Sequence, residues 1–187
     1  MISAVCDACV LYSASLRDFL LRFAEDGLFE PFWSGEIQNE WTHHLLQNRP
    51  DLIREKLERT RLKMDMHFPN GRVHGYETII PTLTLPDPKD RHVLAVAIHA
   101  QTQYIVTFNL KDFPAMVLQS YGIAAVSPDE FIFRLIQKTP DRVLWSVKSH
   151  RLSLTRPSKT VEEYLATLAK QGLPKTVAFL RKHENDI

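Results

Sequence analysis

The chain has 187 residues, of which 44% are hydrophobic and 24% charged, a composition typical of globular proteins and unlike that of disordered ones. A chain of this length suits one α/β domain with an appendage, because domains usually run to roughly 100–200 residues. No apolar run approaches the roughly 20 residues that a membrane-spanning helix needs. The N-terminus, MISAVCDACVLY, lacks the basic region of a signal peptide, so we expect a cytoplasmic protein with no membrane partner.

The net charge of +1 hides an uneven distribution along the chain. Residues 1–137 carry 13 Lys and Arg against 17 Asp and Glu, whereas residues 138–187 carry 10 against 5. An acidic body with a basic C-terminal segment suits a metal site that must also attract a polyanion. A helical segment that is simply solvated by its Lys and Arg side chains would give the same pattern.

The first third of the chain begins with an apolar run over residues 2–6, which predicts a short buried strand with Asp7 directly after it. Residues 28–33 are ambiguous, because Pro31 would confine a strand there to an edge or to a short piece. Cap residues and helical spacing of apolar residues predict helices over about 13–27, 34–47 and 51–67.

Residues 85–113 form the stretch around which the rest is organised. Asp87 followed by Pro88 is an N-cap and first-turn signal, and the apolar helix that it predicts has charge only in its first turn. Residues 104–108 then predict an inner parallel strand that stops at the polar group Asn109–Asp112. Ligands bind beyond the carboxyl ends of strands in open α/β sheets, so Asn109 and Asp112 are placed where a substrate would lie.

The chain continues with a predicted short helix, a small strand over residues 123–126, and a capping box at Ser127 and Glu130 that starts another helix. This alternation of strands and helices predicts a parallel sheet covered on both faces. Residues 138–187 carry only helix signals, so we divide the chain into an α/β domain over 1–137 and a basic helical extension over 138–187.

Four carboxylates fall at positions that face the same edge of such a sheet: Asp7, Glu40, Asp90 and Asp112. Several carboxylates packed together repel one another unless a cation neutralises them. Hard oxygen ligands favour Mg²⁺ or Mn²⁺ over zinc, and two such ions about 4 Å apart can activate a water and stabilise the leaving oxygen of a phosphodiester. Any one of these residues could instead be a helix cap, so the interpretation depends on all four.

Four segments in order and spacing, VCDACVLYS, SGEIQNEW, DPKDRHVLAVAI and YIVTFNLKDF, resemble the PIN-domain ribonucleases, in particular the VapC-type toxins of bacterial toxin–antitoxin pairs. The resemblance covers roughly residues 1–137. It implies a PIN-like α/β/α sandwich, endonucleolytic cleavage of RNA with a divalent metal, dimerisation and inhibition by a protein antitoxin. The acidic residues of the family fall on Asp7, Glu40 and Asp90, and its fourth motif falls on residues 107–112.

One departure concerns the fourth motif, where many relatives carry Asp after Thr-x and this chain has Asn109, with Asp112 three residues later. Either residue could complete the site, Asn109 through its carbonyl or by orienting a water, and Asp112 through its charge. We treat Asp87 as the helix cap. The predicted catalytic residues are Asp7, Glu40, Asp90, Asn109 and Asp112, with all but Asn109 as metal ligands. Residues that could contact the RNA substrate are Lys89, Arg91, Thr107 and Lys111.

Other functions remain open at this point. Phosphatases of the haloacid-dehalogenase type also begin with Asp after an apolar strand, but they need a second Asp two positions on, where this chain has Cys9. A PIN-like module that binds RNA or a partner without cleaving is another alternative, and Asn109 keeps it open. Cys6 and Cys9 form a CxxC that we interpret as structural rather than redox-active, and we expect packing or surface roles for His92 and His99.

Overall fold

The computed structural model describes all residues, 1–187, and their contacts divide the chain into two compact units. The first, here called the sheet unit, contains residues 1–12 and 29–126. The second, the helical unit, contains residues 13–28 and 127–187. The boundary expected after residue 137 does not coincide with this division, because residues 13–28 and 127–137 group with the C-terminal helices.

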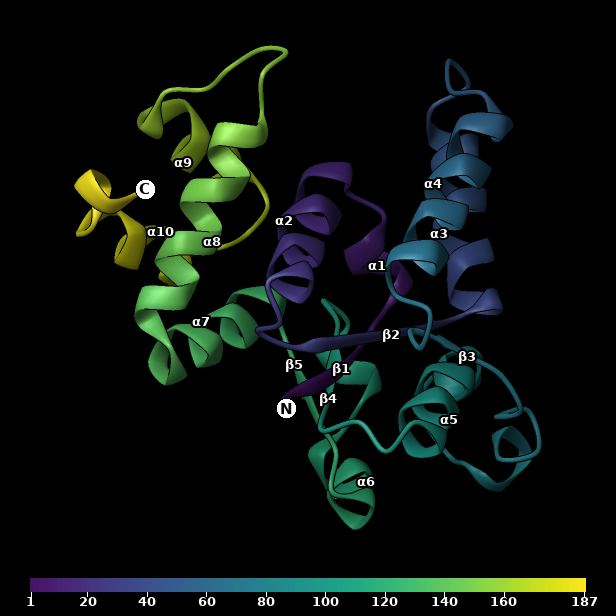
Figure 1. Cartoon of the computed structure of the whole chain (residues 1–187). Coiled ribbons are helices and arrows are strands. Elements are labelled where there is room, and N and C mark those ends of the chain that lie inside the picture. Colours follow the sequence, from purple (N-terminus) through teal and green to yellow (C-terminus); the bar gives the residue numbers. More distant parts are fainter. The chain divides into compact units, whose positions relative to one another are not determined.

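A five-stranded sheet forms the centre of the sheet unit, and every pairing in it is parallel, which confirms the predicted parallel sheet (Figure 1). The strand order is β3-β2-β1-β4-β5. The strands are β1 (Ser3–Cys6), β2 (Glu30–Ser34), β3 (Arg72–Val73), β4 (Tyr104–Val106) and β5 (Ala124–Val126). Because β1 pairs with both β2 and β4, the direction of winding changes at β1, and a crevice opens beyond the carboxyl ends of strands at such a point.

Pro31 was expected to confine the strand to an edge or to a short piece, and it lies in a five-residue strand that has a neighbour on both sides. The Glu30 N–H donates to the Ile2 carbonyl on the β1 side, and the Trp33 N–H donates to the Gly71 carbonyl on the β3 side. Alternation along the strand therefore turns the nitrogen of Pro31 toward β3, which is only two residues long and pairs only with Trp33 and Ser34. The missing N–H costs no sheet hydrogen bond.

Helices cover both faces of this sheet. On one face α5 (Arg91–His99) packs against β1, β2 and β4, while α3 (Gly35–Asn48) packs against β2 from the other (Figure 1). The short α1 (Ala8–Leu11) and the long α4 (Arg54–His67) pack against α3, and α6 (Ala115–Leu118) packs against β5. Trp33 and Trp41 are fully buried in the core, as are residues 93–97 of α5. The predicted α/β sandwich with C-terminal helices is confirmed.

Two element boundaries differ from the sequence-based expectation near the polar edge of the sheet. A 3₁₀ turn, Pro88–Asp90, precedes α5, because the Asp87 carboxylate accepts a hydrogen bond from the Lys89 N–H at 2.9 Å and tightens the chain there. Strand β4 ends at Val106 rather than at residue 108, and the Phe108 side chain is exposed. Both differences leave polar residues at the rim of the sheet in irregular backbone.

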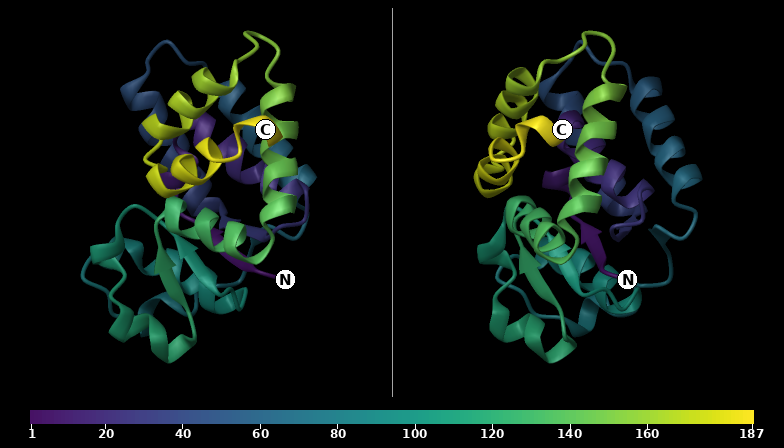
Figure 2. Two further views of the ribbon diagram at one scale, coloured as in Figure 1. Left: turned by 90° about the vertical axis from the view of Figure 1, so that its left-hand side faces the viewer. Right: turned by 60° about the vertical axis from the view of Figure 1, so that its left-hand side comes forward.

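The helical unit contains α2 (Ala14–Glu25), α7 (Pro128–Lys138), α8 (Pro140–Ser153), α9 (Val161–Lys170) and α10 (Pro174–Arg181). Helix α2 packs against α8 and α9, and α10 packs against α7 and α9 (Figure 2). The three helices expected after residue 138 are confirmed. No helix anywhere in the chain combines the length and the apolar character needed to cross a bilayer.

The cap of α7 is simpler than the predicted capping box. The Ser127 hydroxyl accepts from the Glu130 N–H at 3.2 Å, but the Glu130 carboxylate pairs with Lys175 at 2.7 Å instead of returning to the cap. A complete capping box is present at Thr160 and Glu163, where α9 begins. The neighbouring Asp129 is buried and accepts hydrogen bonds from the backbone N–H groups of Lys175 and Thr176, at 2.8 and 2.9 Å, at the start of α10.

Candidate active site at the carboxyl ends of the strands

Asp7 lies at the centre of the polar edge, directly after β1, with 5% of its surface exposed. It caps α1, because its Oδ1 accepts from the Ala8 N–H at 2.6 Å. Its Oδ2 accepts from the Thr107 hydroxyl at 2.7 Å, and its own N–H donates to the Val106 carbonyl. These bonds tie the ends of β1 and β4 together and hold the carboxylate in one orientation.

Thr107 and Cys9 both donate hydrogen bonds to Asp7 Oδ2. Thr107 is fully buried, and its oxygen also accepts from the Asn109 N–H at 3.0 Å, so this residue positions both Asp7 and Asn109. The Cys9 thiol donates to Asp7 Oδ2 at 3.2 Å. Burial, and next the charge of Asp7, raise the pKa of Cys9 to about 12, so the thiol stays neutral. Cys6 is buried as well, and its pKa is also raised to about 12, which agrees with structural rather than redox roles.

An open pocket of about 800 Å³ lies above Asp7. The structure brings four of the five predicted catalytic residues to its wall: Asp7, Glu40, Asp90 and Asn109. Asp112 does not line the pocket, although it is near enough to influence the charge of Asp90. Asp87, expected to act as a helix cap, does cap the turn before α5 and also lines the pocket.

Acidic side chains are concentrated around Asp90. Desolvation raises the pKa of this carboxyl to about 6, and the charges of Asp7, Asp87 and Asp112 add to the shift. Asp7, Asp87 and Asp112 are therefore close enough to oppose the ionisation of Asp90, while the charge of His92 acts in the other direction. A bound cation would remove this repulsion, and that is the electrostatic condition of a divalent-metal site.

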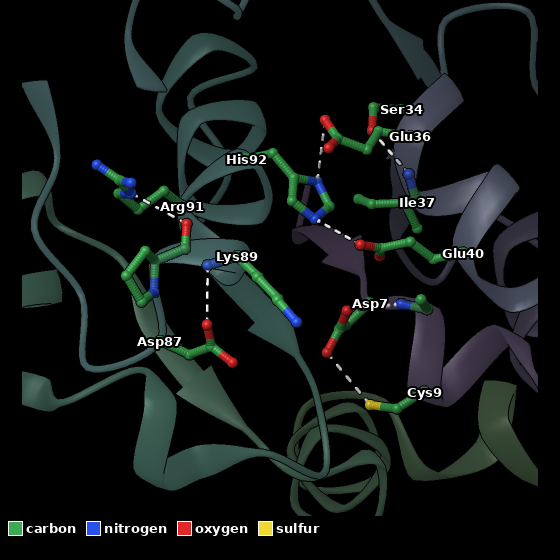
Figure 3. Close-up of polar contacts among 12 residues, drawn as sticks. Asp7, Cys9, Ser34, Glu36, Ile37, Glu40, Asp87, Lys89, Arg91 and His92 are labelled. Carbon is green, nitrogen blue, oxygen red and sulfur yellow. Dashed lines mark hydrogen bonds and ion pairs between the residues drawn. The ribbon is translucent and has the colours of Figure 1, made fainter. Parts of the chain in front are cut away.

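Glu40, which lies on α3, forms a hydrogen bond with His92 of α5. His92 is 3% exposed, and its Nε2 lies 3.1 Å from Glu40 Oε1, while its Nδ1 lies 3.7 Å from Glu36 Oε2 (Figure 3). Burial opposes protonation of His92, but its hydrogen bond with Glu40 and the charges of Glu40, Glu36 and Asp7 together raise its pKa above the ordinary value. His92 thereby joins α5 to α3, the helix that carries Glu40, and Asp90 lies two residues before it in the 3₁₀ turn that precedes α5.

The candidate substrate contacts lie in different places. Lys89 lines the pocket, and Figure 3 shows its side chain extending toward Asp7. Arg91 points away from Asp7 in the same view, and its Nε donates to the Pro88 carbonyl at 3.0 Å. Neither Arg91 nor Lys111 lines the pocket, and Thr107 lies beneath its floor. Of the four, Lys89 is the one within the pocket.

One wall of the pocket consists of residues that sequence reasoning did not single out. Asn39, His43, His44 and Asn48 come from α3, and Tyr12 follows α1. Asn48 donates to the Tyr12 hydroxyl at 3.2 Å. The signal was present in the sequence, because His43 and His44 stand three and four residues after Glu40 and so lie on its face of the helix.

The residues present suit a hard divalent cation. Carboxylates and an amide carbonyl are the donors that Mg²⁺ and Mn²⁺ take, whereas zinc sites are built mainly from Cys and His. As the side chains lie, no three His, Cys, Asp or Glu residues are arranged as a ligand set. Holding an ion therefore requires Glu40 or Asp90 to turn toward Asp7, the one carboxylate that the backbone and Thr107 already fix.

Two family models and one named relative show what this chain is similar to. The PIN domain family model matches residues 3–111, more than half of the chain, and the model for the VapC50 C-terminal domain matches residues 128–182. A protein of Mycobacterium tuberculosis named "Putative ribonuclease VapC50" is 43% identical over 68 residues, which cover 34% of this chain and 40% of that relative. No solved structure matches the chain. Asp7, Glu40, Asp90 and Asn109 all lie within the matched residues 3–111, and the chain belongs to the PIN-domain family.

Proposed function

We propose that the protein is a metal-dependent endoribonuclease and the toxin component of a type II toxin–antitoxin pair. The observation that carries this is the pocket above Asp7, which Asp7, Glu40, Asp87 and Asp90 all line within a fold of the PIN family. A site of this charge repels an RNA phosphate unless a cation is present. Its own electrostatics therefore favour chemistry that depends on a divalent metal.

Asp7, Glu40 and Asp90 would hold Mg²⁺ or Mn²⁺, with Asn109 or Asp112 completing the set. The metal would supply an activated water and neutralise charge at the phosphodiester. The Thr107 hydroxyl holds Asp7 in place by a hydrogen bond, and His92 of α5 holds Glu40 by another. Lys89 extends into the pocket, where its ammonium would hold a phosphate oxygen of the substrate.

The biological partners are part of the proposal. We infer an RNA substrate, a protein antitoxin, a homodimer and action in the cytoplasm. The family matches and the name of the mycobacterial relative support these, although this chain spans 40% of that relative's length. The basic balance of residues 138–187 suits contact with a polyanion.

A PIN-like module that binds RNA without cleaving it is the second candidate. Asn109, in the place of an Asp in many relatives, favours it, as does the absence of a preformed ligand set. A phosphatase of the haloacid-dehalogenase type has less support, because the residue two positions after Asp7 is a neutral thiol that donates to Asp7.

RNA cleavage with and without metal separates these candidates. The purified chain is incubated with a mixed RNA pool and Mn²⁺ or Mg²⁺, then with EDTA, and products are resolved on denaturing gels. We expect endonucleolytic fragments that disappear with EDTA and return when the metal is added in excess. Cleavage that persists in EDTA contradicts a metal mechanism, and no cleavage of any RNA with either metal favours the binding module.

A matched pair of variants guards against a contaminating nuclease. Asp7→Asn keeps the shape of the side chain but removes its charge, and we expect it to abolish cleavage. Asp51→Asn is the control, because Asp51 is exposed in the turn before α4, where it pairs only with Arg49 at 2.7 Å. Equal cleavage by the two variants would contradict the proposed role of Asp7.

A further inference from the structure

The helical unit contains a cavity of its own, of about 360 Å³, which shares no residue with the pocket above Asp7. It is bounded by α2, α8, α9 and the loop that joins α8 to α9, which extends beyond the ends of both helices in Figure 2. A volume near the lower end of the range for ligand pockets suits a single small molecule or one nucleotide. Nothing in the proposed nuclease chemistry uses this cavity.

A buried histidine fixes one wall of the cavity. His150 is 5% exposed, and its Nε2 lies 2.9 Å from Asp18 Oδ2 while its Nδ1 lies 2.7 Å from the Tyr164 hydroxyl. A neutral imidazole satisfies both contacts, donating to Asp18 and accepting from Tyr164. The hydrogen bond from His150 lowers the pKa of Asp18, so this carboxylate is ionised and held in one place. Its side chain is 64% exposed and can accept further hydrogen bonds from a ligand.

Two cations on the loop between α8 and α9 also belong to the cavity wall. Lys159 and Arg156 both line the cavity. Lys159 reaches across to donate to the Thr167 hydroxyl at 2.7 Å, whereas Arg156 has no ion-pair partner in the structure. A guanidinium and an ammonium that line one cavity can together hold a phosphate group.

The surface between these charged groups is largely apolar. Leu154 and Pro157 line it, together with Leu168 and Tyr164, which are buried. The cavity thus offers a fixed anionic acceptor, an apolar platform and a pair of cations. A ligand that matches all three carries adjacent N–H donors on a flat ring and a phosphate joined to that ring through a sugar.

We propose that the cavity of the helical unit binds a guanine nucleotide of RNA, with the Watson–Crick edge of guanine on Asp18 and its phosphate on Arg156 and Lys159. Guanine presents two neighbouring N–H donors on that edge, which match the two oxygens of one carboxylate, and adenine does not. Single-stranded RNA is read on such edges with the base laid against a flat or apolar surface. RNA as the source of the nucleotide rests on the proposed ribonuclease function, and the binding of a guanine nucleotide does not.

Calorimetric titration of the full chain tests this, carried out on the Asp7→Asn variant so that RNA is not cleaved. The titrants are 5′-GMP, 5′-AMP, and two short unstructured RNAs that differ only in one G or A. We expect GMP to bind about tenfold or more tightly than AMP, the discrimination of one bidentate base contact, and the G-containing RNA to show the same preference. A preference for GMP without any preference between the RNAs would assign the site to the free nucleotide and overturn the RNA source.

Substitutions locate the binding. Arg156→Ala should weaken GMP about tenfold, as expected for a lost charge-assisted phosphate contact, and leave guanosine unaffected. Lys170→Ala removes an exposed cation of α9 outside the cavity and is the matched control. Asp18→Asn should abolish the preference for G over A, and circular dichroism checks that the variant is folded. If Arg156→Ala binds GMP like the control, the cavity is not the site.

The failure of this inference differs from a failure of the proposed function. Metal-dependent cleavage of RNA with no binding of GMP overturns the guanine site and leaves the nuclease. Binding of GMP with no cleavage supports the guanine site and contradicts the nuclease function. Binding of an acidic peptide in place of GMP, lost in Arg156→Ala, overturns the nucleotide proposal in favour of a protein partner.

Discussion

Replacing Thr107 with Val tests how Asp7 is held in place. The change keeps the β-branched shape in a fully buried position but removes the hydroxyl that donates to Asp7 Oδ2 at 2.7 Å and accepts from the Asn109 N–H at 3.0 Å. A hydrogen bond to a charged group contributes about 1.5–3 kcal/mol, and the orphaned N–H adds to the loss. We therefore expect the free energy of unfolding to fall by about 2–3 kcal/mol.

Activity should fall as well, because the carboxylate that fixes the position of the metal is released. Loss of a residue that orients a metal ligand typically costs about 10–100-fold, and we expect a decrease of that size in RNA cleavage with Mn²⁺. Urea denaturation followed by circular dichroism and a gel-based cleavage assay measure the two effects. Thr60→Val is the control, since the Thr60 hydroxyl is exposed and bonds only to the Lys56 carbonyl of its own helix. A Thr107→Val protein as stable and active as this control would refute the reasoning.

Three further predictions follow from the charges. Protons compete with the metal for Asp90, whose pKa is about 6, so Mn²⁺ affinity should rise steeply between about pH 5 and 7 in isothermal titrations; the same affinity at both values would contradict this. Without metal, the raised pKa of Asp90 makes the free energy of unfolding depend on pH: the contribution of this group is present below its ordinary pKa of 3.8 and is lost as the pH rises through about 6. Asp90→Asn should remove this dependence from denaturation curves measured across that pH range. Asp129→Ala should lower the free energy of unfolding by about 3 kcal/mol, because a buried carboxylate that accepts from Lys175 N–H, Thr176 N–H and the Thr176 hydroxyl is lost; a change below about 1 kcal/mol would mean that these bonds are not important.

Local signals in the sequence predicted local structure well. The cap residues Ser34 and Thr160 both accept the backbone N–H expected of them, because a cap depends only on residues within one helical turn. The alternation of strands and helices fixed the parallel sheet, and the rule that ligands bind beyond strand ends placed Asp7 and Asn109 in one pocket.

Features that depend on distant contacts could not be predicted in this way. The pairing of His92 with Glu40 joins residues 52 positions apart, and the spacing of residues along the chain does not predict it. The placement of Pro31 inside the sheet depends on how short β3 is, and a two-residue strand leaves almost no pattern. The grouping of α2 with the C-terminal helices likewise follows from Phe19 and His150, whose ring centroids lie 5.5 Å apart.

The proposed function depends most on a metal ion among Asp7, Glu40, Asp90 and Asp112. Anomalous diffraction at the manganese edge, from a crystal grown with Mn²⁺, locates the ion directly. We predict a peak in the pocket above Asp7 with Asp7 and Asp90 as ligands and Glu40 or Asp112 nearby. A peak elsewhere on the chain, or none in that pocket at saturating Mn²⁺ above pH 7, would contradict the proposed chemistry.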